Sequence, residues 1–143
     1  MKFESKKDML FSVIILGLNA FFITIIVLGL INGEIKQQEY WPLIVIFGVV
    51  ILIFWLFFGT NYKLTKQDGL IYKCGPLKGQ IKIEDITQII KGKTLWVGLK
   101  PATSRNGLII KYNKYDEIYI SPKTNETFIK KILELNSNIK ITE

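Results

Sequence analysis

Two long apolar runs dominate the first part of the chain. Residues 9–31 and 42–58 contain no charged side chain, and the segment between them, residues 32–41, is mostly polar. At a helical rise of about 1.5 Å per residue, the runs span roughly 34 Å and roughly 27 Å, close to the thickness of a bilayer hydrocarbon core. A buried helix of a soluble protein is usually shorter or carries a polar stripe. The pattern therefore predicts a transmembrane hairpin over residues 1–59.

Asn19 is the polar exception within the first run. An amide near the middle of a membrane should face the second helix or bond to its own backbone. Gly17 and Ala20 beside it, with Gly48 in the second run, would then permit close approach of the helices. The alternative, a polar path through the hairpin, would require several copies of the chain.

Beyond Gly59, short alternating segments separated by turn residues indicate β-strands. Phe128, Ile132 and Leu135 recur at helical spacing, which predicts an amphipathic helix capped at Ser121-Pro122 and ended by Asn136. The expected fold class is a membrane protein with a two-helix hairpin and then a small β-barrel of pleckstrin-homology-like (PH-like) type over residues 60–143. About seven antiparallel strands are expected, at residues 61–65, 70–74, 80–83, 87–91, 94–99, 108–112 and 117–120.

The charge distribution predicts the orientation of the hairpin. Residues 60–143 hold 15 Lys plus Arg against 8 Asp plus Glu, and Lys2, Lys6 and Lys7 precede the first run. The connecting segment offers only Lys36. Because cytoplasmic loops are rich in Lys and Arg, both termini are expected in the cytoplasm, with residues 32–41 outside.

The composition narrows the possible chemistry. The chain has no His and only one Cys, Cys74, so the commonest zinc sites and nucleophile–base pairs cannot be assembled. A single Cys also cannot form an intrachain disulfide, which suits a reducing cytoplasm. No catalytic residue, metal ligand or cofactor is expected, and one Arg without a known motif argues against nucleic-acid binding.

The C-terminal part resembles a known family. The residues that carry the resemblance are Pro101-Ala102-Thr103-Ser104, Leu108-Ile109-Ile110-Lys111-Tyr112, Ile118-Tyr119-Ile120-Ser121-Pro122-Lys123 and Phe128-Ile129, with Tyr62-Lys63-Leu64 and Ile83-Glu84-Asp85-Ile86. Together they resemble the YyaB-like bacterial PH-like domain family, whose members often carry two N-terminal membrane helices. The family usually has a basic residue directly before the apolar strand, where this chain has Gly107, with Arg105 two positions earlier.

Five residues are candidates for contact with a partner or the membrane. Lys63 and Lys66 are expected nearest the inner leaflet, because they closely follow the second helix. Trp96, Ser104 and Arg105 belong to residues 92–107, a segment longer than a hairpin needs. Trp96 either fills the barrel or contacts a partner, and the lysines either bind lipid or only solubilise the domain.

These features favour a non-catalytic, membrane-anchored module that binds a protein partner, self-associates or contacts the inner leaflet. The alternative is an immunity protein that protects the cell against a membrane-active bacteriocin, because some small bacterial membrane proteins with PH-like domains resemble this chain and have that role. A membrane enzyme is disfavoured by the absence of His and of charges in the two runs.

Overall fold

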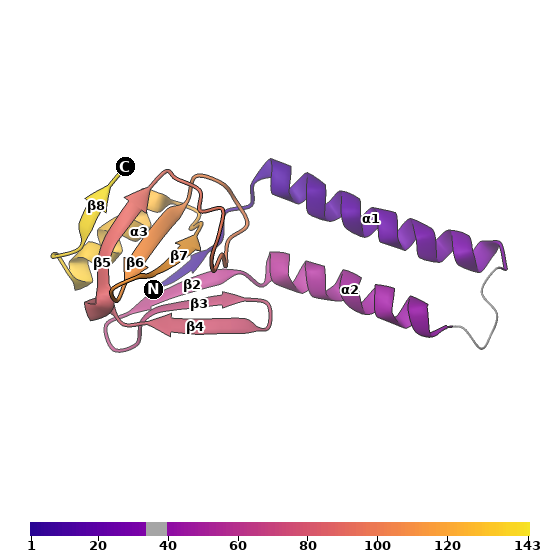
Figure 1. Ribbon diagram of the computed structural model, residues 1–143, viewed down its shortest axis with the longest axis horizontal. Helices are drawn as coiled ribbons and strands as arrows, with labels where there is room; N and C mark the ends of the chain where they lie inside the picture. Colours follow the sequence, from indigo (N-terminus) through magenta and orange to yellow (C-terminus); the bar gives the residue numbers. More distant parts are fainter. Residues whose placement is uncertain (34–39) are drawn as a thin grey trace.

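The computed structural model describes residues 1–33 and 40–143. The two apolar runs form α1 (Met9–Ile31) and α2 (Trp41–Phe58), which extend together from a strand-rich region (Figure 1). Both are long and apolar enough to cross a membrane, by length and composition, and most of their apolar side chains are exposed. Part of the expected outer segment, residues 34–39, lies outside the described residues.

Asn19 lies on the buried side of α1, where it is only 1% exposed. Its side-chain amide donates to the backbone carbonyl of Ile15 at 2.7 Å, one of the two arrangements expected for it. The expected role of the small residues is wrong. A Cβ added at Gly17 or Gly48 would meet no heavy atom within 4 Å, and Ala20 is exposed.

The first sheet has the order β1-β2-β3-β4 and is antiparallel throughout. Its strands are β1 (Lys2–Glu4), β2 (Asn61–Thr65), β3 (Gly69–Cys74) and β4 (Leu77–Ile81). The strand β1 was not predicted from the sequence, because three residues are too few to show the alternation of polar and apolar positions that identifies a strand. It places Phe3 opposite Tyr62 and thereby brings the residues before α1 into the domain.

The second sheet has the order β7-β6-β5-β8. A 3₁₀ turn (Ile83–Asp85) leads into β5 (Ile86–Lys91), which is followed by β6 (Leu108–Tyr112), β7 (Asp116–Ile120) and β8 (Lys140–Thr142). The strand β8 was also missed, and it pairs with β5 in parallel, so the sheet is not purely antiparallel as expected. An isolated bridge between Ser5 and Pro122 connects the two sheets next to β1 and β7.

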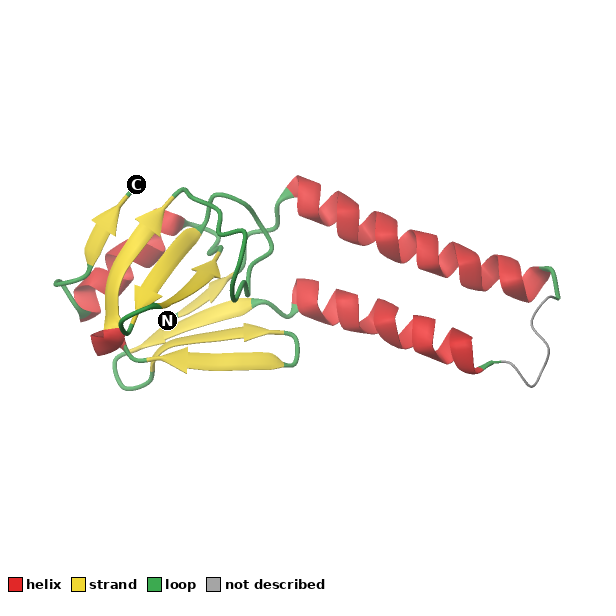
Figure 2. Ribbon diagram, in the orientation of Figure 1, coloured by secondary structure: helices red, strands yellow, loops and turns green. Residues whose placement is uncertain are grey.

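A single apolar core is shared by the two sheets and α3 (Asn125–Leu135). Figure 2 shows the strands and the helix that contribute to it. Phe128 and Ile132 of α3 are fully buried, and Asn136 ends the helix as predicted. The N-cap, however, is Thr124 rather than Ser121. Ser121 cannot serve there because its hydroxyl is buried and bonded to Ser5.

Two expected strands differ from the structure. Residues 94–99 form no strand, because within the described residues only Leu99 finds a sheet neighbour, Ile118. The strand expected at residues 80–83 begins earlier, at Leu77, because a tight turn with Gly75 at φ +57° follows β3 directly. Gly79 lies inside this strand, and a Cβ there would meet the Tyr72 hydroxyl at 2.1 Å.

The packing of β1 gives a stability prediction. The ring of Phe3 meets Phe128 edge to face, with centroids 5.1 Å apart. Phe3→Ala should therefore lower the free energy of unfolding by about 1–3 kcal/mol, since the ring is half-buried. Glu4→Ala, at an exposed position of the same strand, should change it by less than about 0.5 kcal/mol. Urea unfolding of the intact chain in detergent micelles measures both, and equal values would show that β1 does not stabilise the domain.

Candidate functional site

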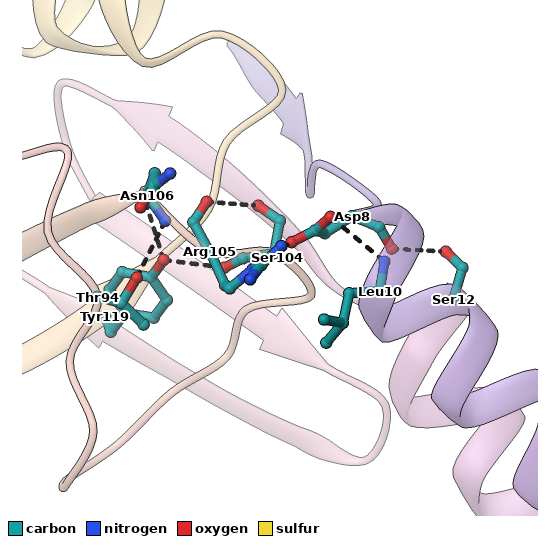
Figure 3. A network of polar contacts seen from close by, with 9 residues as sticks. Asp8, Leu10, Ser12, Thr94, Ser104, Arg105, Asn106 and Tyr119 are labelled. Carbon is teal, nitrogen blue, oxygen red and sulfur yellow. Dashed lines mark hydrogen bonds and ion pairs between the residues drawn. The ribbon is translucent and has the colours of Figure 1, made fainter.

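The segment between β5 and β6, residues 92–107, forms a long loop fixed at its base. The amide of Gly92 donates to the carbonyl of Gly107 at 3.0 Å, and the amide of Asn106 donates to Thr94 Oγ1 at 3.1 Å. Tyr119 of β7 supports the same end, because its hydroxyl accepts from the Gly107 amide and donates to the Ser104 carbonyl, both at 2.8 Å (Figure 3). The loop is therefore held in place where it meets the sheet.

The close packing around Gly107 leaves no room for a side chain in this structure. A Cβ at this position would lie 2.2 Å from the backbone carbonyl oxygen of Ile120 and 3.0 Å from the Tyr119 hydroxyl. A basic side chain cannot be placed there without moving the backbone. Arg105, two residues earlier, is instead exposed and turned toward the start of α1 (Figure 3).

An ion pair connects the loop to the first helix. Arg105 Nε donates to Asp8 Oδ2 at 2.9 Å, and Asp8 is the N-cap of α1, accepting from the Leu10 amide through Oδ1 at 3.4 Å (Figure 3). The hydrogen bond from Arg105 lowers the pKa of Asp8 below its usual range. Because the Asp8 carboxylate is near the surface, this contact orients the helix more than it stabilises the domain.

Buried hydroxyl groups join the loop to the segment before α1 and to β2. We call them the hydroxyl cluster, and they belong to Ser5, Tyr62, Thr103 and Ser121. The Ser5 hydroxyl bonds to those of Thr103 and Ser121 at 2.8 and 2.9 Å, and the Tyr62 hydroxyl donates to the Pro101 carbonyl at 2.5 Å. Thr103 Oγ1 also donates to the carbonyl of Lys6 at 2.7 Å. Burial raises the pKa of Tyr62, so its phenol stays protonated and available as a donor.

The hydroxyl cluster accounts for part of the family resemblance. Thr103 belongs to the quoted segment 101–104, and Ser121 belongs to segment 118–123. In the structure both segments accept hydrogen bonds from the residues just before α1. The amide of Lys6 donates to the Ser121 carbonyl at 2.7 Å, and the amide of Asp8 donates to the Thr103 carbonyl at 3.2 Å. These residues therefore fix the helix to the domain.

Beside the loop lies a groove of about 420 Å³, which we call the loop groove. Leu10 and Phe11 of α1 form one wall, and Leu95, Trp96, Lys100 and Arg105 belong to the loop side. At the tip, Trp96 is 79% exposed and Val97 is 82% exposed. The interior position considered for Trp96 is therefore wrong, and the side chain is open to contact.

The five candidate residues divide into two groups. Trp96, Ser104 and Arg105 all line the loop groove. Ser104 is nevertheless buried, and its hydroxyl reaches only the carbonyl of Arg105, at 3.4 Å, so it shapes the loop.

The two candidate lysines lie elsewhere. Lys63 is exposed on β2 opposite Lys2. Lys66 lies in the turn after β2, at the end of that strand farther from α2 (Figure 1). Lys66 is therefore farther from the end of α2 than Lys63, and its expected position near the inner leaflet stays a prediction.

The start of α1 and the end of α2 are joined by a contact that the sequence did not predict. The amine of Lys7 donates to the carbonyl of Phe57, at the end of α2, and lies 4.3 Å from the centre of the Phe57 ring. Burial of this amine lowers the pKa of Lys7. Ser5, Lys7 and Asp8 carry no sequence signal for these contacts, because their partners lie 50 to 116 residues away.

The described residues also contain no group of three or more His, Cys, Asp or Glu side chains placed to hold a metal ion. The thiol of Cys74 lies 3.3 Å from Thr60 Oγ1, beside the junction between α2 and β2. The arrangement is therefore one of contact surfaces, hydrogen bonds and charges.

Comparison with known proteins agrees with the resemblance. The Bacterial PH domain family matches residues 60–136. The uncharacterized protein YyaB of Bacillus subtilis (strain 168) is 31% identical over 142 residues, which cover 99% of this chain and 97% of that protein. The similarity therefore includes the two helices as well as the domain. No solved structure matches the chain.

The hydroxyl cluster gives the second prediction. Thr103→Val keeps the shape of the side chain but removes the hydrogen bond to the buried Lys6 carbonyl and one of the hydrogen bonds of the Ser5 hydroxyl, which keeps Ser121 and Tyr62 as partners. We expect a loss of about 1–3 kcal/mol in the free energy of unfolding, measured with urea in micelles. Thr87→Val is the matched control, because Thr87 is exposed, and it should cost less than about 0.5 kcal/mol. Equal losses would contradict a stabilising role for the cluster.

Proposed function

The chain belongs to the bacterial PH-domain family, and from this premise we propose that it is a non-catalytic binding module anchored in the cytoplasmic membrane. In this proposal α1 and α2 cross the bilayer as a hairpin, and both termini lie in the cytoplasm. The PH-like domain is held at the inner leaflet and binds a protein partner through the tip of the 92–107 loop.

The exposed surface of the two helices supports membrane anchoring. Most of their apolar side chains are exposed among the described residues, a state that water disfavours and a hydrocarbon layer accepts. Both helices meet the domain at the same end (Figure 1), as a hairpin that leaves and re-enters one side of a membrane requires. The basic domain and the Lys-poor connection favour the cytoplasmic side for that end.

The observation that carries partner binding is the exposure of Trp96 and Val97 on a loop with a fixed base. Apolar side chains this exposed at adjacent positions are typical of contact surfaces, and Trp is enriched at binding hot spots. The contacts of Arg105 and Thr103 hold the second half of the loop before any partner arrives. A preordered loop loses less conformational entropy on binding.

The composition supports a non-catalytic role. The chain has no His and a single Cys, which removes the common nucleophile–base pairs. The titratable side chains lining the loop groove are Lys100, Arg105 and Tyr119, and the Tyr119 hydroxyl is occupied by backbone partners. This set suits binding of an apolar and anionic surface better than proton transfer.

The topology gives the third prediction. In a Cys74→Ser background, Asn32→Cys should react with a membrane-impermeant thiol reagent in intact cells, because residue 32 follows α1 on the outer side. Lys114→Cys, at an exposed turn of the domain, should react only after the membrane is permeabilised. The labelling yields before and after permeabilisation give the result. Reaction of Lys114→Cys in intact cells would contradict the proposed orientation.

Site-specific crosslinking gives the fourth prediction. A photoreactive amino acid at Val97 should form one discrete protein adduct in native membranes, with a partner or with a second copy. Trp96→Ala in the same chain should reduce its yield about tenfold or more, since truncating a hot-spot residue commonly costs about 2 kcal/mol.

The control uses the same photoreactive group at Tyr115, which is 84% exposed on the β6–β7 turn. It should give no such adduct. Equal adducts from positions 97 and 115, or none from position 97 in a correctly inserted chain, would contradict a binding role of the loop tip.

A further inference from the structure

A second hollow, of about 630 Å³, lies between the segment before α1 and the junction of α2 with β2. Four lysines line it: Lys2, Lys6, Lys7 and Lys123. Among its described lining residues, Glu4 is the one carboxylate. We call this feature the lysine hollow.

The fold brings these lysines together from distant parts of the sequence. Lys2 is held on β1 opposite Lys63 of β2. The amide of Lys6 donates to the Ser121 carbonyl at 2.7 Å, and the amide of Lys123 donates to the Glu4 carbonyl at 3.0 Å. The backbone positions of the lysines are therefore fixed by the same hydrogen bonds that join β1 to the rest of the domain.

Three of the four amines are free to bind an anion. The amine of Lys7 is used by the Phe57 carbonyl and ring. Within residues 1–33 and 40–143, the amines of Lys2, Lys6 and Lys123 form no ion pair and no hydrogen bond. An anion bound in the hollow would be attracted by positively charged residues from two parts of the chain, the segment before α1 and the segment before α3.

The position of the lysine hollow indicates where the anion comes from. Phe58, the last residue of α2, lines it and is 63% exposed, and Lys6 and Lys7 immediately precede α1. The hollow thus opens where the apolar surface of the hairpin ends. If the helices cross the bilayer, as proposed above, this is the level of the lipid headgroups on the inner leaflet.

We propose that the lysine hollow binds the headgroup phosphate of an anionic phospholipid, with Lys2, Lys6 and Lys123 around the phosphate and Phe58 beside the lipid chains. This inference rests on the membrane anchoring proposed above. It is not a property of the family domain alone, because three of the four lysines precede residues 60–136, the part that matches the Bacterial PH domain.

The test uses the intact chain in nanodiscs that contain equal amounts of phosphatidylglycerol and phosphatidylcholine. After gentle detergent release, native mass spectrometry counts the lipids that stay bound. We expect retained phosphatidylglycerol to exceed phosphatidylcholine by about fivefold or more, the effect of one lysine near an anionic surface. Equal retention of the two lipids would overturn the proposal.

Matched variants separate the site from the general basicity of the chain. Lys2→Gln, Lys6→Gln and Lys123→Gln together should bring the ratio close to one, whereas Arg at the same three positions should preserve it. The control is Lys66→Gln, Lys111→Gln and Lys130→Gln together, which removes the same charge from exposed positions elsewhere and should leave the ratio unchanged. Equal losses in the Gln variant and in the control would overturn the proposal, and the urea midpoint of each variant checks that it is folded.

Two further measurements show which part of the proposal a negative result contradicts. Inorganic phosphate should not displace the retained lipid, and displacement by phosphate alone would show a site for a free anion rather than a lipid. Flotation with vesicles tests the anchoring separately. A chain that fails to float overturns the proposed function and this inference with it, whereas a chain that floats without lipid preference overturns only the lipid site.

Discussion

The pairing of β1 with β2 is the constraint on which the rest of the structure depends. The strand β1 leads into α1, and β2 follows α2, so two neighbouring strands carry the two ends of the helical hairpin. Their register, with Phe3 opposite Tyr62, sets the distance between the helices where they meet the domain. The same pairing delivers Phe3 to Phe128 of α3 and Ser5 to the hydroxyl cluster. A segment of eight residues thus belongs at once to the sheet, the core and the helix junction.

The two proposed contact surfaces, the loop groove and the lysine hollow, are both formed at this junction. At the start of α1, Asp8 binds Arg105 and Leu10 lines the loop groove, while Lys2 and Lys6 line the lysine hollow. Each surface therefore combines residues from the N-terminal segment with residues from the family domain. Hydrogen bonds to buried hydroxyl and carbonyl groups keep both in place, because leaving such groups without partners is costly. Anchoring and binding would then share one set of contacts.

The sequence predicted the elements with strong periodicity and missed those that depend on tertiary contacts. Two long apolar runs, alternating segments such as β6, and the apolar face around Phe128 identify their structures by themselves. Segment 94–99 has a similar pattern, but among the described residues only Leu99 forms a bridge to a strand, at Ile118, and Trp96 is exposed. The short strands β1 and β8 form only because β2 and β5 offer free edges. Of the candidate site, Trp96 and Arg105 were identified by residue type and loop length, whereas the four lysines of the hollow share no spacing that a sequence could reveal.

The coupling between helices and sheet also limits how the helices can move relative to the domain. A shift of α1 along its axis relative to α2 would slide β1 past β2, and a slip of one residue would turn the side chains of β1 to the opposite face. Phe3 would leave the core and Ser5 would leave the hydroxyl cluster, at a combined cost far above that of a surface contact. Lys7 adds a further restraint, because its amine donates a hydrogen bond to the Phe57 carbonyl in the last turn of α2. If the helices cross the bilayer as proposed, the hairpin and the domain would therefore move as one unit, and the loop tip and the lysine hollow would keep fixed positions relative to the helix ends.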